Sequence, residues 1–228
     1  MGVAAVGRTV LPGLLLFVVG TAIAAAYFFV PAVGEALGAV GRLKDRIGLP
    51  FGIATTVFFG GLVPLLLRPL QKRPNAGHPP LTHTLVGLLY WVYAGVILEL
   101  FFRLQTAMFG DRADVATVAA KVAFDFAVYN PLWEAPFAVL FFQLNNRLHA
   151  RHPAVTPPEP TGGFFAWYRQ RVVPMLFTVT AIWLPPAIAI YTLPTTLQLP
   201  VSNLLVSFWA LILPLQVDLA EVDRRDMA

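Results

Sequence analysis

The stretch TVLPGLLLFVVGTAIAAAYFFV, which runs from Thr9 to Val30, contains no charged side chain. An α-helix rises about 1.5 Å per residue, so about 20 apolar residues cross the hydrocarbon core of a bilayer. Arg8 and the sequence AIAAA at 22–26 resemble parts of a signal peptide, but the apolar run continues through Val30. That length exceeds the usual apolar core of a cleaved signal. We therefore expect a retained first membrane span.

Similar apolar blocks recur along the whole chain. Residues 47–67 and 172–193 are also free of charge, and the 228-residue chain is 57% hydrophobic and 12% charged, with a mean hydropathy of +0.70. The blocks are continuous rather than alternating between polar and apolar residues, which favours helices over a transmembrane barrel. We predict an all-α fold, a polytopic transmembrane helical bundle of about six spans, in a single domain, 1–228. The expected spans are 9–30, 47–67, 81–102, 115–144, 172–193 and 199–217.

Prolines inside the spans predict kinks, because proline lacks an amide hydrogen and its ring clashes with the preceding turn. We expect helix kinks at Pro64, Pro131, Pro185 and Pro186, the last two breaking the fifth span. The pair Gly60-Gly61 allows another helix to approach closely. Only a few residues separate the fifth and sixth spans, so these two are expected to form an antiparallel hairpin.

The fourth predicted span is the most polar, and its polar side chains include Lys121, Asp125, Asn130 and Glu134. A charge at the centre of a span costs about 2.5–3.5 kcal/mol on insertion scales, so such residues usually face protein or water. Lys121 and Asp125 are four residues apart and would share one face of an α-helix, where they can pair. Asn130 and Glu134 repeat this spacing. Two interpretations stay open: the four residues line a water-accessible path, or they hold the fourth helix against its neighbours.

Polar and aromatic residues in the other spans have structural explanations. Glu99 and Arg103 are spaced for an interfacial ion pair. Asn203 and Ser207 lie four residues apart and can hydrogen-bond to a neighbouring helix. The aromatic residues within 90–93 are expected to pack inside the bundle rather than bind a ligand.

The charge distribution indicates the partner and the topology. The net charge is +4, but the basic residues are scattered through short connections, so we expect no nucleic-acid partner. Ten of the 16 basic residues fall on the side of a six-span arrangement that holds both termini, which predicts cytoplasmic termini. The amphipathic segment 34–46 is expected to rest among lipid headgroups. We predict that the protein lies in a bacterial cytoplasmic membrane, with an organellar membrane as the alternative location. Its expected partners are the lipid bilayer and further copies of the same chain in a homo-oligomer.

Several chemistries lack their residues in this sequence. The chain has no cysteine, which excludes disulfides, thiolate metal sites and thiol catalysis. His149 and His152 form a His-x-x-His pair without an acidic third ligand nearby, so we predict no metal site. No nucleophile elbow, zinc-protease motif or phosphate loop is present. We therefore expect no enzyme activity and no cofactor.

The segment KVAFDFAVYNPLWEAPFAVLFFQL, residues 121–144, resembles the signature of the peroxisomal membrane protein 22-kDa family. Its Mpv-type members occur in mitochondrial inner and peroxisomal membranes, with relatives in bacteria. The lysine, aspartate and proline of that signature match Lys121, Asp125 and Pro131. The resemblance implies a small multi-span protein whose relatives are thought to form channels for ions or small solutes.

A second signature of that family is a tryptophan–proline break followed by a tryptophan near the end of the next helix. Trp183, Pro185 and Trp209 are similar to it. Residues 187–191 depart from the family, because they replace the glutamine and asparagine–phenylalanine that usually follow the break. A shared pore lining on this helix is therefore not implied.

These observations lead to two functional hypotheses. The first is channel-like permeation of ions or small solutes, in which Asp125, with Lys121 as its counter-charge, tunes a narrow polar path. Asn130 and Glu134 continue that path beyond the kink. The alternative is a non-conducting membrane scaffold or quality-control protein, in which the same residues only hold the helices together.

Overall fold

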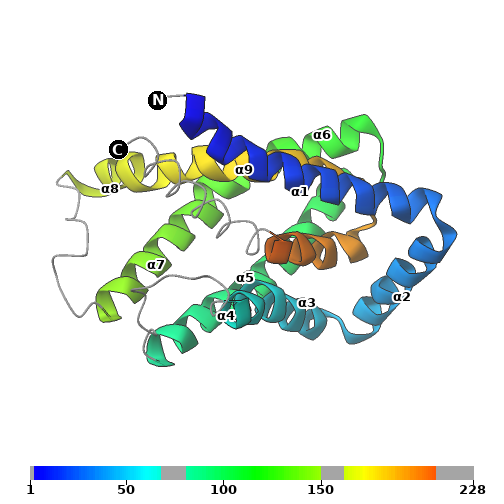
Figure 1. Cartoon of the computed structure of the whole chain (residues 1–228), viewed down its shortest axis with the longest axis horizontal. Helices are drawn as coiled ribbons and strands as arrows, with labels where there is room; N and C mark the ends of the chain where they lie inside the picture. Colours follow the sequence, from blue (N-terminus) through cyan, green and yellow to red (C-terminus); the bar gives the residue numbers. More distant parts are fainter. Residues whose placement is uncertain (1–2, 68–80, 150–161, 209–228) are drawn as a thin grey trace, which may run out of the picture.

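The computed structural model describes residues 3–67, 81–149 and 162–208, and every regular element in these ranges is a helix (Figure 1). This confirms the all-helical prediction for the described part of the chain. The α-helices and the π-helical segments (η) between them are α1 (Val3–Phe29), α2 (Pro31–Ile47), α3 (Leu49–Thr56), η1 (Val57–Leu62), α4 (Val63–Leu67), α5 (Leu81–Phe109), α6 (Val115–Phe124), η3 (Asp125–Glu134), α7 (Ala135–His149), α8 (Gly163–Trp167), η5 (Tyr168–Val172) and α9 (Val173–Tyr191). A last helix is described over residues 195–208.

Within the described residues, three continuous helices are long and apolar enough to cross a membrane: Leu49–Leu67, Leu81–Phe109 and Gly163–Tyr191. A fourth candidate combines α1 and α2, which are bent by 101° relative to each other. The predicted number of six spans is therefore not confirmed by length and composition. Residues 115–149 form one helical stretch that does not meet these criteria, and the predicted span 199–217 is described only as far as residue 208.

Each of the three π-helical segments in the described residues ends two residues before a proline. The prolines are Pro64, Pro136 and Pro174. At the end of each segment an amide donates to the carbonyl five residues earlier: Val63 to Phe58, Ala135 to Asn130 and Val173 to Tyr168. A proline ring collides with the carbonyl four residues before it, and a wider turn moves that carbonyl away. The prolines thus explain where the helices widen.

In two of these segments, the carbonyl five residues before the proline lacks an amide donor, because proline has no N–H. This carbonyl instead accepts a hydrogen bond from a hydroxyl group on another helix. The Phe59 carbonyl, which lies five residues before Pro64, accepts a hydrogen bond of 3.1 Å from Ser207. The Pro131 carbonyl, five residues before Pro136, accepts a hydrogen bond of 2.8 Å from Tyr168. Buried backbone carbonyls need such partners in a membrane interior. These bonds join η1 and η3 to helices far away in the sequence.

The predicted kinks have different outcomes. Pro64 lies two residues after the end of η1, and Pro131 lies inside η3, so the helix is irregular near both positions. Pro185 and Pro186, in contrast, lie within α9, which stays α-helical from Val173 to Tyr191. The predicted break of the fifth span at these two prolines is not found.

Helices α1 and α9 lie side by side (Figure 1). A Cβ on Gly13 would lie 2.7 Å from the Ala181 carbonyl oxygen, so the two backbones are nearly in contact. After a turn at 192–194, the helix 195–208 packs into the same apolar cluster. Its Leu205 and Pro186 of α9 both approach Gly20. The last helix therefore folds back along α9, as the predicted hairpin requires.

A second close contact joins η1 to α5. A Cβ on Gly60 would collide with the indole ring of Trp91, and one on Gly61 would lie 3.0 Å from Cδ1 of the same ring. Only glycine leaves room for the indole at these positions. The predicted close helix approach at the glycine pair is thus confirmed, with Trp91 as its partner.

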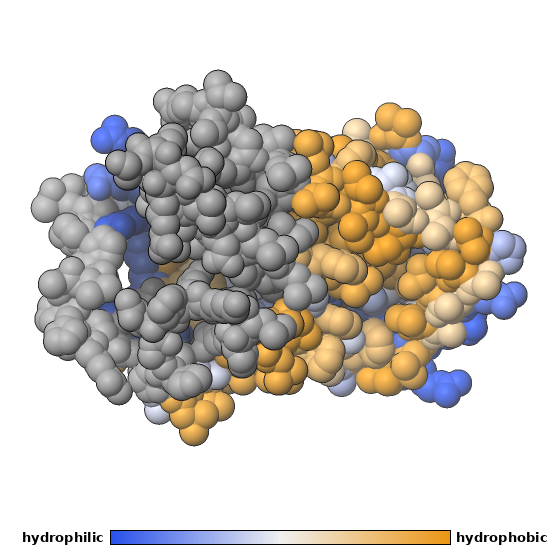
Figure 2. Space-filling view, in the orientation of Figure 1, coloured by the Kyte–Doolittle hydropathy of each residue, from blue (hydrophilic) through white to orange (hydrophobic). Residues whose placement is uncertain are grey.

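The outer surface is largely apolar. On the face shown in Figure 2, hydrophobic residues cover most of the described surface, and hydrophilic ones lie at the right-hand edge, where Figure 1 has α2, and at the left. Phe29 is 83% exposed and Phe177 is 75% exposed. Exposed aromatic and aliphatic side chains on this scale are expected where lipid chains cover a protein. Together with the three long apolar helices, this surface is consistent with a membrane protein.

Candidate functional site

Asp125, the first residue of η3, is buried with 9% of its surface exposed. Its Oδ1 accepts a hydrogen bond of 3.0 Å from the Asn130 side-chain amide. Its Oδ2 accepts one of 2.6 Å from the hydroxyl of Tyr191, the last residue of α9. Both carboxylate oxygens thus have neutral donors, one from the same helix and one from α9.

Glu134, the last residue of η3, has a similar arrangement. Its Oε2 accepts a hydrogen bond of 3.0 Å from the Tyr129 hydroxyl, and its Oε1 accepts one of 3.2 Å from Tyr90 of α5. The Tyr129 ring stacks on Phe101, with centroids 3.8 Å apart, which fixes the position of the hydroxyl. Each end of η3 therefore carries a carboxylate held by two neutral donors.

The π-helical geometry of η3 decides which residues meet. In an α-helix, residues four apart share a face, but a π-helix closes its turn over five residues. Asp125 meets Asn130, and Tyr129 meets Glu134, each five residues along. The spacing of four used in the sequence prediction, which would place Asn130 beside Glu134, does not apply in this segment.

The predicted pairing of Lys121 with Asp125 is wrong, although the Asp125 amide donates to the Lys121 carbonyl with the α-helical spacing of four. The Lys121 side chain is buried, and its ammonium lies 3.9 Å from Oδ1 of Asp111 in the loop before α6. Among the described residues it has no hydrogen-bond partner. Its backbone carbonyl accepts a hydrogen bond of 3.0 Å from Gln105. Lys121 therefore belongs to a second polar cluster and is not the counter-charge of Asp125.

Asp125 and Glu134 line one cavity of about 240 Å³, together with Asn130. Apart from Ser202, its other walls are apolar or aromatic, and they come from α5, η3, α9 and the last helix. They include Trp91, Phe101, Trp183, Tyr191, Ser202 and Val206. None of the described residues that line the cavity is basic. The cavity thus combines two acidic groups with aromatic walls, and it is our candidate site.

The second polar cluster lies near the loop between α5 and α6. Glu99 forms ion pairs of 2.9 Å with Arg103, as predicted, and with Lys44 of α2, which the sequence analysis missed. Lys44 also donates 3.4 Å to the carbonyl of Thr195. The Thr195 side chain and amide in turn donate to Asp111 at 2.6 Å and 3.0 Å. This cluster joins α2, α5 and the start of the last helix.

Asn203 holds the last helix to α3. Its side-chain amide donates to Thr56 at 2.9 Å and to Thr55 at 3.2 Å. Together with Ser207, which bonds to the Phe59 carbonyl, it confirms the predicted hydrogen bonding across helices. None of these four side chains lines the cavity between Asp125 and Glu134. They explain packing rather than chemistry.

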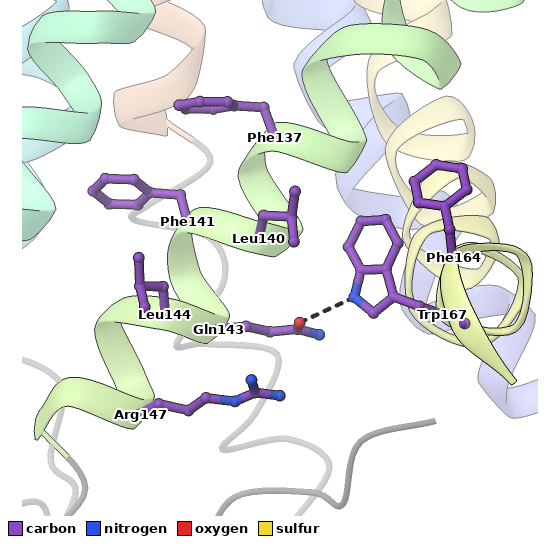
Figure 3. A pocket seen from close by; sticks show the side chains of 9 residues that line it. Phe137, Leu140, Phe141, Gln143, Leu144, Arg147, Phe164 and Trp167 are labelled. Atoms are coloured by element: carbon purple, nitrogen blue, oxygen red, sulfur yellow. Dashed lines mark hydrogen bonds between the residues drawn. The ribbon is translucent and has the colours of Figure 1, made fainter. Parts of the chain in front are cut away.

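A wider groove of about 570 Å³ lies between α7 and α8 (Figure 3). Phe137 and Phe141 line it from α7, and Phe164 lines it from α8. The indole of Trp167 donates a hydrogen bond of 3.1 Å to Gln143 across the groove. The carboxylates of η3 are not among its lining residues. Residues 150–161, which connect its two walls, lie outside the described residues.

No metal centre is found in the described ranges, because no three His, Asp or Glu side chains there are arranged to hold an ion. His152, one member of the His-x-x-His pair, lies outside those ranges. So do Trp209 and the rest of the predicted sixth span.

Comparisons of the chain with protein-family models, curated proteins and solved structures found no match. The resemblance to the peroxisomal membrane protein 22-kDa family therefore stays a prediction that rests on the residues quoted for it.

Proposed function

We propose that this protein provides channel-like permeation for ions or small solutes, through a path that includes the cavity between Asp125 and Glu134. The observation that carries the proposal is that both carboxylates line this one cavity. Acidic side chains within membrane helices are costly and usually mark a solute or ion pathway. The proposal assigns no catalytic step to the chain.

The widened helix around the cavity supports this function. A π-helical segment arises where an α-helix accommodates strain, and such segments frequently occur at functional sites. Here η3 spans ten residues and carries a carboxylate at each end, both turned towards the same space. A regular α-helix would not bring Asp125 to Asn130 and Tyr129 to Glu134. The widening therefore creates the polar lining that permeation needs.

The membrane arrangement is part of the proposal. We infer six membrane-crossing segments, which add α1, residues 115–149 and the last helix to the three helices that are apolar enough on their own. Both termini would lie on the cytoplasmic side of a bacterial membrane, as the distribution of basic residues favours. A homo-oligomer and membership of the Mpv-type family belong to the same proposal. An organellar membrane is the alternative location.

Flux through reconstituted proteoliposomes tests this function. We expect the wild type to release small ions or solutes faster than protein-free liposomes, and we expect Asp125→Asn and Glu134→Gln to change the rate or the selectivity. Glu35→Gln removes an exposed acid on α2 and serves as the matched control, with wild-type flux expected. Absence of flux from every preparation, with correctly inserted protein, would contradict permeation.

A non-conducting scaffold is the second candidate, because one observation favours it. Every oxygen of the two carboxylates already accepts a hydrogen bond from the protein, so these residues also connect η3 to α5 and α9. A scaffold predicts that Asp125→Asn lowers thermal stability in detergent and leaves bilayer permeability at the level of empty liposomes. Permeation predicts altered flux in a variant that remains folded.

A further inference from the structure

The described residues supply no counter-charge to the cavity between Asp125 and Glu134. Ion pairs within the described ranges involve other acids: Glu99 with Lys44 and Arg103, Asp114 with Arg112, and Asp111 with Lys121. Neither cavity carboxylate takes part in one, and no basic residue is found among the described residues of the lining. A cation that enters this cavity would therefore meet two acids without displacing a lysine or an arginine.

The carboxylates retain capacity for such a ligand. Each oxygen of Asp125 and Glu134 accepts one hydrogen bond, from Asn130, Tyr191, Tyr129 or Tyr90. A carboxylate oxygen offers two acceptor sites, so each oxygen still has one available. The existing donors hold both groups in fixed positions. The cavity is thus preorganised for a positive charge.

The remaining walls select the type of cation. Trp91, Phe101 and Trp183 line the cavity together with aliphatic side chains. Aromatic faces attract ammonium groups, and the attraction is strongest where water is excluded, whereas a small inorganic ion would lose its hydration shell to these apolar walls. Pockets for drug-sized molecules have volumes of about 300–1,000 Å³. At about 240 Å³, this cavity suits a smaller ligand.

We propose that the cavity binds a small organic cation, an ammonium group with short alkyl substituents, and that permeation is selective for this class. This inference rests on the proposed function, since it names the solute of the same path. The carboxylates would balance the charge of the ammonium, and the aromatic rings would contact its alkyl groups.

Equilibrium binding in detergent micelles tests the inference without any flux measurement. The probes are choline and 3,3-dimethylbutan-1-ol, which has the same shape but no charge. Calorimetric titration of the wild type is expected to show binding of choline and at least about tenfold weaker binding of the alcohol. Equal affinities for the two probes would overturn the inference.

Variants locate the binding site. Glu134→Gln keeps the shape of the side chain and removes its charge, and it should weaken choline binding by about tenfold. Trp183→Leu should weaken it several-fold, which provides a second test if Glu134→Gln does not fold. Glu35→Gln, on the outer surface of α2, should bind choline like the wild type. Wild-type affinity in both folded cavity variants would contradict a site in this cavity.

The two proposals fail in different ways. Selective choline binding without flux would remove permeation and leave an organic-cation site. Flux that does not distinguish choline from the neutral alcohol, in a protein that binds both equally, would remove the selectivity and leave permeation.

Discussion

The hydroxyl of Tyr191 donates a hydrogen bond of 2.6 Å to Oδ2 of Asp125, which joins the last residue of α9 to the first residue of η3. Both residues are buried, with Tyr191 only 2% exposed. The bond fixes one carboxylate of the cavity and attaches the π-helical segment to the α1–α9 pair. The site and the packing of the bundle therefore depend on the same contact.

Replacing Tyr191 with phenylalanine removes the hydroxyl that donates a hydrogen bond to Oδ2 of Asp125. We expect Tyr191→Phe to lower the free energy of unfolding by about 1–3 kcal/mol, the cost of an unsatisfied buried acceptor. Unfolding by denaturant in detergent micelles measures the loss. The control is Tyr27→Phe, at a ring that packs against the α1–α9 cluster, and it should cost less. Equal stability of Tyr191→Phe and wild type would contradict the assigned bond.

The glycine pair gives a second test of packing. A methyl group at Gly60 collides with the Trp91 indole, so we expect Gly60→Ala to destabilise the protein by about 1–3 kcal/mol. A methyl group at Gly87 in α5 would meet no atom of another described element within 4 Å. Gly87→Ala should therefore be neutral or stabilising, because alanine favours the helix. The prediction is wrong if both alanine variants unfold at the same denaturant concentration.

The backbone carbonyl of Pro131, which lies five residues before Pro136, allows a double-mutant test. Tyr168→Phe leaves the Pro131 carbonyl without its donor, and we expect a loss of about 1 kcal/mol in stability. Pro136→Ala restores an amide hydrogen five residues after that carbonyl. In the Pro136→Ala background the Tyr168→Phe change should therefore cost less, measured as a coupling energy in a thermodynamic cycle. Strict additivity would show that the missing amide does not explain the tyrosine contact.

Asp114 caps α6 outside the predicted spans. The Thr117 amide and hydroxyl donate to its carboxylate at 3.0 Å each, and these bonds lower the pKa of Asp114 below its usual value. A lowered pKa in the folded state adds stability above the unfolded-state pKa of about 3.9, and this is lost as the pH falls through the folded-state value. The stability gap between wild type and Asp114→Ala should thus shrink on acidification. Thermal unfolding at several pH values measures it, and a gap independent of pH would contradict the cap.

The sequence predicted the helical segments well, because long charge-free runs such as 47–67 and 172–193 leave few alternatives to helix. It also identified Asp125 and Glu134, since acids in apolar segments are rare. It predicted an amphipathic segment at 34–46 after the first span, and α2 covers it, but it did not predict the angle of 101° between α1 and α2.

The residues that hold the site were harder to predict. The sequence analysis assigned to packing, or left out, the three tyrosines Tyr90, Tyr129 and Tyr191. A tyrosine in an apolar segment can either pack its ring in the core or donate a hydrogen bond, and the sequence does not distinguish the two. The pairing error at Lys121 came from expecting its partner on the same helix, whereas the nearby carboxylate is Asp111, in the loop before α6. The sequence did contain a signal for the widened helix of η3, because Pro136 follows Pro131 by five residues. A proline alone, however, does not indicate which turn of the helix will widen.

The central claim, that the space between Asp125 and Glu134 is open to solutes and favours cations, is tested most directly by thiol labelling in the intact membrane. The chain has no native cysteine, so Ser202→Cys places one thiol on the cavity wall, and Ser207→Cys places one on the same helix outside the lining. We predict that Ser202→Cys reacts with a trimethylammonium thiosulfonate faster than with its sulfonate counterpart, that Glu134→Gln reduces this preference, and that Ser207→Cys stays protected. Protection of Ser202→Cys from both reagents, equal to that of Ser207→Cys, would contradict the account.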